Sequence, residues 1–258
     1  MNDRHNGRTR SDSEDSSSVA LSWQVTDQTH AFIKREEVLR WANVNENALV
    51  EPGIEFLKPQ TGESWEAGIA WQDATQLYQA SLYRLDLDDE LLYAPYAFGG
   101  WGANVNLDQT RREGLLLEAE RKLTDRLRVG GQYSFTDTEL RAGANKGNEI
   151  PWVSRHSAAM HLDYQIIANL HGYLEAIYTG PLYLASDDGL ALPKEGGYTL
   201  FNAAIRYEYR NLNAKLRINN LTGKRYDSYA VYNSWQAGNK ALYPAPEEDI
   251  QLSVGYRF

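Results

Sequence analysis

The sequence predicts an all-β protein whose antiparallel strands form part of a transmembrane β-barrel. Three observations predict this class: apolar and polar residues alternate repeatedly, short and long connections alternate strictly, and aromatic residues are abundant. The chain has 258 residues, with 17 Tyr, 7 Trp and 6 Phe but only 2 Met. Ring side chains fit a pleated, half-buried surface. The composition therefore favours strands over helices.

No segment of the sequence predicts a membrane-spanning helix, which would need about 20 nearly continuous apolar residues. The longest uncharged apolar stretch, residues 91–103, is interrupted by Pro95, Gly99, Gly100 and Gly102. Hydrophobic residues make up 42% of the chain, charged residues 24%, and the mean hydropathy is -0.57. A helical membrane protein is therefore excluded.

The charge balance argues against a nucleic-acid partner. The chain has 35 acidic and 26 basic residues, a net charge of -9, whereas phosphate binding needs a basic face. The absence of cysteine removes disulfides, thiolate metal sites and cysteine nucleophiles. Residues 1–15 are mostly Arg, Asp, Ser and Asn and lack the apolar core of a secretory signal peptide.

Strands are predicted wherever apolar and polar residues alternate with a period of two. The first segment shows this at Val19, Leu21 and Trp23, and the pattern continues to the end of the chain. From the N-terminus onward we count about eleven such segments. They cover residues 19–25, 29–36, 64–72, 76–87, 110–121, 126–136, 157–165, 170–179, 199–209, 212–220 and 249–258. Two are less regular: 76–87 has a phase slip typical of a bulge, and 170–179 fits either register.

The connections are short and long in strict alternation. The short ones are residues 26–28, 73–75, 122–125, 166–169 and 210–211. The long ones are residues 37–63, 88–109, 137–156, 180–198 and 221–248. Transmembrane barrels have short periplasmic turns and long extracellular loops. The alternation therefore predicts which end of each strand lies on which side of the membrane.

The two faces of the predicted strands differ in chemistry. In lipid, an outward row must be apolar with rings near the interfaces, while a lumen row can carry charge. One row carries Arg128, His161, Asp163, Lys215 and Arg217. The other row carries Trp23, Trp65, Trp71, Tyr133, Phe135, Tyr164 and Tyr207. A soluble β protein with an aromatic core would explain any one strand, but the alternating loop lengths favour the barrel.

The C-terminal residues resemble a known targeting signal. Leu252, Val254, Tyr256 and Phe258 alternate and end the chain on an aromatic residue. This pattern resembles the signal by which bacterial outer-membrane barrels reach the barrel assembly machinery. We identify these residues as a candidate barrel-assembly signal.

Longer motifs resemble the TonB-dependent outer-membrane receptors. Residues 218–227, INNLTGKRYD, resemble the Asn-Leu-Phe-Asp-Lys-Arg-Tyr stretch near the end of these proteins, with Thr222-Gly223 in place of Phe-Asp. Upstream, residues 21–27, 57–68 and 112–118 resemble family segments in the expected order. The loop at residues 40–46 departs from the family because it lacks the usual proline.

This resemblance implies a specific architecture and location. The family's barrel has 22 strands around an inserted plug, so about eleven strands would form the C-terminal half of a 22-stranded barrel. Residues 19–258 would be the partial barrel, without plug domain or TonB box, and residues 1–18 a polar, extracellular-loop-like N-terminus. We expect a C-terminal fragment in the bacterial outer membrane, although the chain as given lacks a signal peptide.

The resemblance also implies partners and a transport function. The expected ligand is a ferric siderophore or a similar metal complex. Expected partners are outer-membrane lipid, the barrel assembly machinery, the missing N-terminal plug and barrel half, and the TonB system through that plug alone. Rings on loops can hold such a ligand by stacking or cation-π contact, although girdle or loop packing explains them as well. The candidates are Tyr93, Tyr96, Phe98 and Trp101 in one loop and Tyr229, Tyr232, Trp235 and Tyr243 in the last.

We expect no enzymatic activity, catalytic residue, metal site or cofactor. The neighbours His156 and Ser157 suggest a base and a nucleophile, but adjacent strand residues point to opposite faces. The acidic residues at 86 and 88–90 could gather a hard cation, but a solvated loop explains them better.

Two alternatives to the receptor fragment stay open at this stage. One is a small self-standing outer-membrane barrel with porin or hydrolase activity. The other is a soluble β-sandwich binding module. The edge strands discriminate among the three, because the backbone groups of a half barrel's first and last strands cannot be satisfied by lipid.

Overall fold

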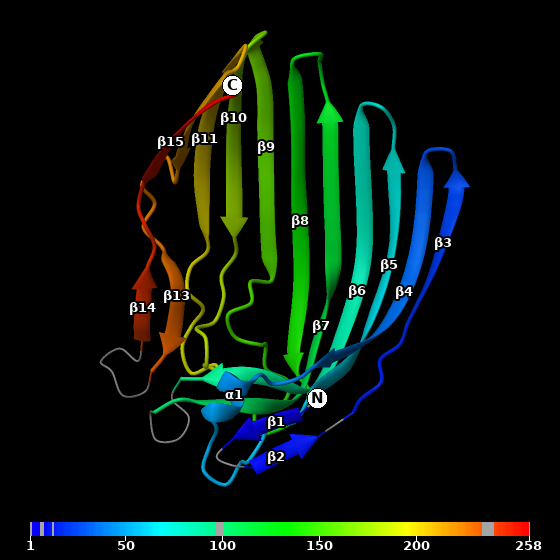
Figure 1. Ribbon diagram of the computed structural model, residues 1–258, viewed down its shortest axis with the longest axis vertical. Helices are drawn as coiled ribbons and strands as arrows, with labels where there is room; N and C mark the ends of the chain where they lie inside the picture. The colour runs from blue at the N-terminus through cyan, green and yellow to red at the C-terminus, as the bar shows by residue number, and fades with distance from the viewer. Residues whose placement is uncertain (1, 6–7, 12, 96–100, 234–239, 258) are drawn as a thin grey trace.

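The computed structural model describes residues 2–5, 8–11, 13–95, 101–233 and 240–257. Its main feature is one curved sheet of eleven antiparallel strands (Figure 1). The strands are β3 (Ser18–Thr26), β4 (Thr29–Arg40), β5 (Gln60–Gln72), β6 (Gln76–Ala94), β7 (Ala103–Lys122), β8 (Leu127–Leu140), β9 (His156–Ile167), β10 (Leu170–Thr179), β11 (Tyr198–Tyr209), β12 (Leu212–Asn219) and β15 (Asp249–Tyr256). The eleven predicted strands are confirmed.

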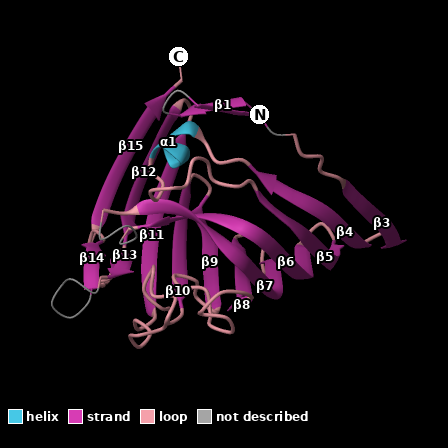
Figure 2. Cartoon of the chain, turned by 90° about the horizontal axis from the view of Figure 1, so that it is seen from below, coloured by secondary structure: helices cyan, strands magenta, loops and turns pink. Residues whose placement is uncertain are grey.

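The strands lie beside each other in the order in which they occur along the chain, and β15 completes the sheet beside β12. Short turns lie at one end and long connections at the other, as the loop lengths predicted (Figure 1). Among the described residues, β3 and β15 each have a neighbour in this sheet on one side only. The sheet is thus an open arc, and no second sheet of comparable size packs against it (Figure 2).

Four short strands and one helix were not predicted. A hairpin of β1 (Asn2–His5) and β2 (Arg8–Ser11) occupies the N-terminus that was expected to be loop-like. The last long connection contains a second hairpin, β13 (Asp227–Tyr232) with β14 (Lys240–Pro244). Helix α1 (Val44–Ala48) begins with a capping box, in which Asn43 and Glu46 each bond to the other's backbone N–H.

Among the described residues, no helix combines the length and the apolar character that crossing a bilayer requires.

The short turns are held by local hydrogen bonds to side chains. In the β5–β6 turn, the Asp73 carboxylate accepts bonds from the backbone N–H of Thr75 at 2.6 Å and of Gln76 at 2.9 Å. These donors lower the pKa of Asp73 because they stabilise its charged form. A carboxylate that caps the backbone in this way favours a tight reversal of the chain.

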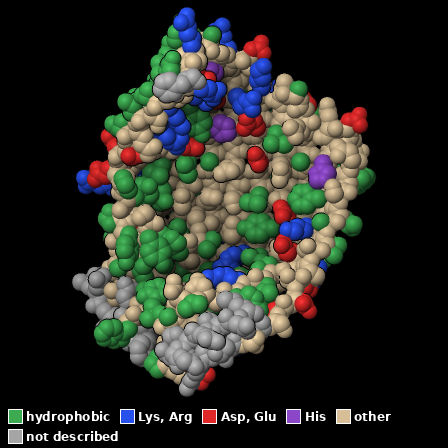
Figure 3. Space-filling model, in the orientation of Figure 1, with side chains coloured by type: hydrophobic (Ala, Val, Ile, Leu, Met, Phe, Trp, Pro, Cys, Tyr) green, Lys and Arg blue, Asp and Glu red, His purple; other side chains and the backbone are tan. Residues whose placement is uncertain are grey.

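The register agrees with the two predicted faces. One cross-strand row contains Tyr164, Gly172, Ile205, Leu216 and Leu252. The adjacent row contains Arg128, Asp163, Tyr173, Ala204 and Arg217. The second row lines the concave face, on which histidine and charged side chains stand (Figure 3). We call these faces the outward face and the lumen face.

Two irregularities differ from the sequence-based expectation. The phase slip predicted within residues 76–87 is wrong, because β6 pairs continuously with β7 there. The irregularity comes later, at Asp89, which adopts a φ of 52° and is skipped in the ladder. Strand β10 has a register shift between Leu170 and His171, which places Leu174 on the outward face and Glu175 on the lumen face.

The outward face changes from apolar to charged at its loop end. On β8 the outward residues from Leu127 to Phe135 are apolar, a length of about 26 Å along the strand. Beyond them, Arg111 pairs with Asp86 at 2.5 Å and Arg155 with Asp137 at 2.7 Å. The apolar length is close to the ~25 Å band of membrane barrels. The paired charges therefore mark where the apolar part of the outward face ends.

The lumen face uses glycine where an aromatic ring crosses a neighbouring strand. The Tyr83 hydroxyl bonds to the Thr136 hydroxyl at 2.8 Å by passing over Gly114 of the strand between them. A Cβ at Gly114 would lie 2.9 Å from that hydroxyl and 2.0 Å from the backbone oxygen of Phe135. No other residue type leaves room for both neighbours.

We expect Gly114→Ala to destabilise the barrel by about 1–3 kcal/mol, because the new methyl group overpacks the β7–β8 ladder. Gly172→Ala is the control, since its Cβ would meet only Ile166 side-chain carbon at 3.4 Å. Thermal unfolding of the two variants, each carried in a complete barrel purified in detergent, checks this. Equal midpoints for both would contradict the packing described for Gly114.

Candidate functional site

The long connections gather at one end of the sheet in two groups. The first group is the extended β6–β7 hairpin, whose far end bends across the concave side toward α1 (Figures 1 and 2). Val50 forms a bridge with Asn104, whose side-chain amide donates to the Glu46 carbonyl at 2.9 Å. Lys58 adds an ion pair with Asp89 at 3.0 Å. The segment that follows β4 is thus fixed onto the β6–β7 hairpin.

The second group joins three connections that are distant in sequence. Ala185 N–H donates to the Ala230 carbonyl at 3.0 Å, and Tyr232 N–H donates back to Ala185 at 2.9 Å. Trp152 N–H donates to the Tyr183 carbonyl at 3.0 Å. Leu184 is fully buried among these segments, with 0% exposure. The β13–β14 hairpin and the loops after β8 and β10 therefore form one packed assembly, which we call the loop assembly.

Aromatic rings hold part of the loop assembly together. Trp152 meets Tyr229 edge to face with centroids 5.0 Å apart, and Tyr229 lies 5.7 Å from Tyr243. Such pairs contribute about 0.5–1.5 kcal/mol beyond the area they bury. Tyr229 and Tyr243, two predicted ligand candidates, thus have packing partners. Trp152 was missed, because no sequence pattern links it to the β13–β14 hairpin.

Two cations of the loop assembly, Lys194 and Lys240, are paired. Lys194 contacts Glu149 at 2.6 Å and lies over the Tyr183 ring at 4.9 Å. Lys240 pairs with Glu195. These pairs connect the loop after β8, the loop after β10 and the β13–β14 hairpin.

Two neighbouring aspartates in the loop assembly have different roles. Asp187 is 2% exposed and accepts hydrogen bonds from the backbone N–H of Ala191 at 2.8 Å and Leu192 at 3.1 Å. Asp188 uses its backbone carbonyl to accept from Asn148 at 2.8 Å. Burial, followed by the charge of Asp187, raises the pKa of Asp188 because its ionised form is poorly solvated.

The other aromatic candidates lie on the β6–β7 hairpin or outside the described residues. Trp101 is 82% exposed and Tyr93 48% exposed. They are close in space, because a Cβ at Gly102 would lie 2.3 Å from the Tyr93 hydroxyl. Tyr96, Phe98 and Trp235 fall on residues that the structure does not describe. Tyr232 is half-buried in β13. The structure therefore brings Tyr93 and Trp101 together on one hairpin and Tyr229 and Tyr243 on another.

A small cleft of about 180 Å³ lies beside the loop assembly. Tyr198 and Tyr226 form part of its wall, with ring centroids 4.7 Å apart, and Lys224 and Arg225 add positive charge. Lys224, Arg225 and Tyr226 belong to the 218–227 motif, and Tyr198 follows a long loop. No local pattern predicts that these residues lie at one site.

The 218–227 motif has a structural role that its sequence did not reveal. Asn220 is 5% exposed with a φ of 51°, and its side-chain oxygen accepts from Lys224 N–H at 2.8 Å. Its amide donates to the Lys224 carbonyl at 2.8 Å. Asn202 of β11 accepts from Asn220 N–H at 2.9 Å. Asparagine tolerates this left-handed conformation and satisfies the turn's backbone groups at the same time.

The lumen face carries a hydrogen-bonded polar network. Glu175 accepts from Tyr173 at 3.0 Å, Asn202 at 2.8 Å and Arg217 at 3.2 Å. Nearby, Asp163, His171, Arg206 and Lys215 border a hollow of about 240 Å³. A face of this kind suits a hydrated or protein-filled interior rather than lipid.

The residues considered for chemistry are not assembled into a reactive site. His156 Nδ1 lies 2.8 Å from the Tyr133 hydroxyl on the outward face, whereas Ser157 pairs with Ser134 on the lumen face. Within the described ranges, no group of three or more acidic or histidine side chains is placed to hold a metal ion.

The candidate barrel-assembly signal lies on the outward face of β15. Leu252, Val254 and Tyr256 are 72%, 66% and 61% exposed, in line with Leu216, Ala214 and Leu212 of β12. Phe258 lies outside the described residues.

Comparison with known proteins identifies this architecture. A family model described as "TonB dependent receptor-like, beta-barrel" matches residues 2–221. The "Ferrioxamine receptor" of Yersinia enterocolitica is 27% identical over 215 residues, covering 79% of this chain and 28% of the relative. The "Ferrichrome outer membrane transporter/phage receptor" of Escherichia coli is 28% identical over 210 residues, covering 78% of this chain and 27% of the relative. The chain thus spans under a third of these relatives.

Solved structures show the same fold. The siderophore receptor PiuA from Acinetobacter baumannii matches 93% of this chain with a TM-score of 0.72 and 18% identity, over 35% of its own length. The ferric yersiniabactin uptake receptor FyuA from Yersinia pestis matches 93% with a TM-score of 0.76 and 17% identity, over 37% of its length. The copper transporter OprC matches 97% with a TM-score of 0.78 and 17% identity, over 40% of its length.

We expect Tyr229→Ala to loosen the loop assembly. Loss of both ring contacts should lower the local opening free energy by about 1–3 kcal/mol, which corresponds to roughly 5- to 150-fold faster cleavage. Limited trypsin digestion at Lys224, Arg225 and Lys240 measures this rate. Tyr229→Phe keeps the ring and should cleave at the native rate. Equal rates for the Ala and Phe variants would contradict the packing role.

We expect Asp188→Asn to stabilise the loop assembly at neutral pH. Because the folded-state pKa of Asp188 is raised, the native state holds its proton more tightly, and stability is lost as pH rises from 3.8 through the raised pKa. The Asn variant has no such loss. Thermal unfolding of the complete receptor, with and without the substitution, across this pH range checks the sign. If the unsubstituted receptor became more stable than the variant as the pH rises, the result would contradict this prediction.

Proposed function

Because the chain belongs to the TonB-dependent receptor-like β-barrel family, we propose that it is the C-terminal barrel portion of an outer-membrane receptor for ferric siderophores. The open sheet of eleven strands carries this proposal. Half of the 22 strands of a plugged transporter barrel are present, and they form an arc with two free edges. The remaining strands and the plug would complete the receptor.

The free edges also separate this proposal from its alternatives. Unpaired backbone groups on β3 and β15 cannot be satisfied by lipid, so the described arc does not form a self-standing barrel. A sandwich needs a second packed sheet, and the two other sheets of the described residues are two-stranded hairpins. Both observations favour a receptor portion over a small porin or a soluble binding module.

The relatives suggest the kind of cargo. Two of them are named as receptors for ferrioxamine and ferrichrome, and each matches more than three quarters of this chain. We therefore take a ferric siderophore as the transported ligand. We infer no enzymatic step, because the relatives are transport receptors and the polar side chains of the lumen face bond to one another.

Ligand contact is best assigned to the β6–β7 hairpin. Trp101 is 82% exposed there at the loop end, with Tyr93 on the same hairpin, whereas Tyr229 (38% exposed) and Tyr243 (54% exposed) lie against other rings. An exposed ring at the mouth is free to stack on a ligand, and a packed ring is not. Tyr96 and Phe98 of the same connection remain candidates, as do Tyr232 and Trp235 of the last one.

The remaining partners follow from the same architecture. The outward face would contact outer-membrane lipid, and the exposed row on β15 would present the assembly signal to the barrel assembly machinery. The TonB system would act only through the plug, which we place against the lumen face.

The direct functional test is uptake of radiolabelled ferric ferrioxamine by cells that express the complete receptor. We expect Trp101→Ala to lower apparent affinity by about ten-fold, since loss of one stacked ring costs about 1–3 kcal/mol in comparable sites. Tyr229→Phe is the matched aromatic control away from the proposed contact and should transport normally. Uptake that is indifferent to loss of the complete gene would overturn the proposed function, whereas normal affinity in the Trp101 variant would overturn only the contact.

Orientation can be tested with single cysteines, because the native sequence has none. Trp101→Cys in the long connection should react with an impermeant maleimide on intact cells. Asp125→Cys, in a short turn where the side chain is 98% exposed, should react only after the outer membrane is permeabilised. The reverse pattern would refute the assignment of long loops to the outside.

A further inference from the structure

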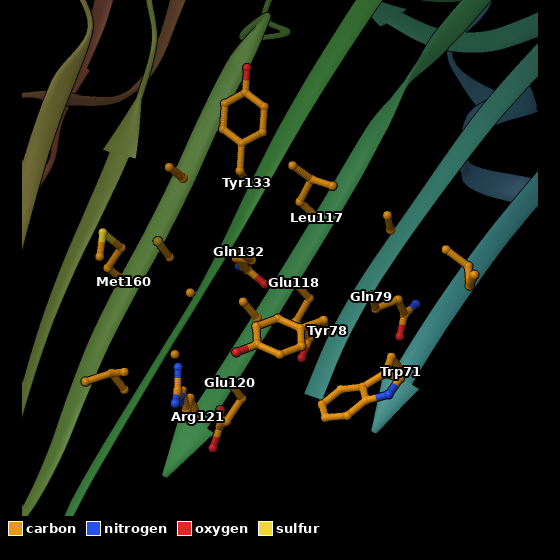
Figure 4. Close-up of a pocket in the computed structure, with 18 residues that line it drawn as sticks. Trp71, Tyr78, Gln79, Leu117, Glu118, Glu120, Arg121, Gln132, Tyr133 and Met160 are labelled. Carbon is orange, nitrogen blue, oxygen red and sulfur yellow. The ribbon is translucent and has the colours of Figure 1, made fainter. Parts of the chain in front are cut away.

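The outward face contains an apolar groove of about 800 Å³. Trp71 and Tyr78 lie on one side and Met160 on the other, with Tyr133 at the end away from Arg121 (Figure 4). Ala119 also lines the groove. Nearly all of its exposed lining is apolar. Its size falls within the range of about 300–1,000 Å³ that is typical of small-molecule sites.

The strand register explains why a groove forms here. One cross-strand row runs through Trp71, Tyr78, Ala119, Gly131 and Met160. Two large rings, which stack with centroids 5.8 Å apart, are followed by two very small residues and then by a long one. The depression therefore lies along β7 and β8, between raised walls on β6 and β9.

A single cation stands at the short-turn end of this groove. Arg121 follows Ala119 on the outward row of β7, lines the groove and is exposed. Within the described part of the chain, Arg121 has no hydrogen bond or ion pair, whereas Arg35, Arg84 and Arg111 at the loop end of the same face are all paired. The neighbouring Glu120 points to the lumen face and pairs with Arg128 at 2.9 Å. The charge of Arg121 is thus available to an external anion.

We propose that this groove binds a phospholipid of the periplasmic leaflet, with one acyl chain on the Ala119–Gly131 floor and its phosphate at the Arg121 guanidinium. An apolar channel ending in an unpaired cation matches an amphiphile with an anionic head. Arginine binds phosphate oxygens through two parallel N–H donors. Trp71 and Tyr78 flank the same end, at the level where interfacial rings lie near headgroups.

The location of the groove at the short-turn end favours a phospholipid of the periplasmic leaflet over other ligands. The groove opens toward the short turns, which the proposed function places at the periplasmic side, so lipopolysaccharide of the outer leaflet would lie at the opposite end of the strands. The inference rests on that membrane placement and not on the identity of the transported ligand.

The test uses the complete receptor purified from outer membranes in a mild detergent and titrated with palmitoyl-oleoyl-phosphatidylglycerol under native mass spectrometry. Arg121→Gln should weaken binding of the tightest lipid about ten-fold. Arg126→Gln is the matched control, because it removes the same charge at the same end of the strands, outside the groove. Ala119→Phe should remove the tightest lipid by filling the floor, whereas Ala67→Phe, also outward but outside the groove, should not.

Equal affinities for the Arg121 and Arg126 variants, or a tightly held lipid in the Ala119→Phe protein, would overturn the proposal. Siderophore uptake by the Ala119→Phe receptor should be unchanged, because the substitution lies on the outer wall. Loss of lipid binding with normal uptake would support the lipid site. Lipid binding in a receptor that transports no siderophore would support the lipid site but overturn the proposed function.

Discussion

The structure depends on one constraint: inside a bilayer every backbone N–H and C=O must find a partner within the protein. Strands in an antiparallel sheet meet this requirement with their neighbours, and each interior strand of the eleven does so on both sides. The outer edges of β3 and β15 do not. The need for further strands is therefore a physical property of the sheet, and it is the reason to regard the chain as part of a larger barrel.

The same pairing determines the chemistry of each face. Because side chains alternate along a strand, the register that pairs the backbone also aligns Tyr164 with Ile205 on the outward face and Asp163 with Arg217 on the lumen face. The average composition therefore resembles that of a water-soluble protein, although the outward face is mostly apolar. Charge returns to the outward face at both ends of the strands: in pairs such as Arg111 and Asp86 at the loop end, and as Arg121 at the short-turn end.

Alternation and loop length were sufficient to predict the eleven strands and their faces, because both signals are local. The loop assembly could not be predicted, since Trp152 and Tyr229 are brought together by chain segments whose relative positions no local pattern specifies. The capping box at Asn43 and Glu46 was readable in principle but lay in a segment expected to be irregular. The groove was also hidden, because Ala119 and Gly131 become neighbours only once the register is known. Of the predicted ligand rings, the structure separates exposed Trp101 from packed Tyr229, a distinction that depends on tertiary contacts.

The central claim is that these eleven strands do not form a membrane barrel by themselves. Heat-dependent gel mobility of the 258-residue chain alone, extracted from membranes in detergent, tests it most directly. The account predicts no compact, heat-modifiable monomer and no single-channel conductance, with both the compact form and membrane retention restored when the remaining strands are coexpressed. A compact, detergent-stable monomer with a defined conductance from the chain alone would contradict it.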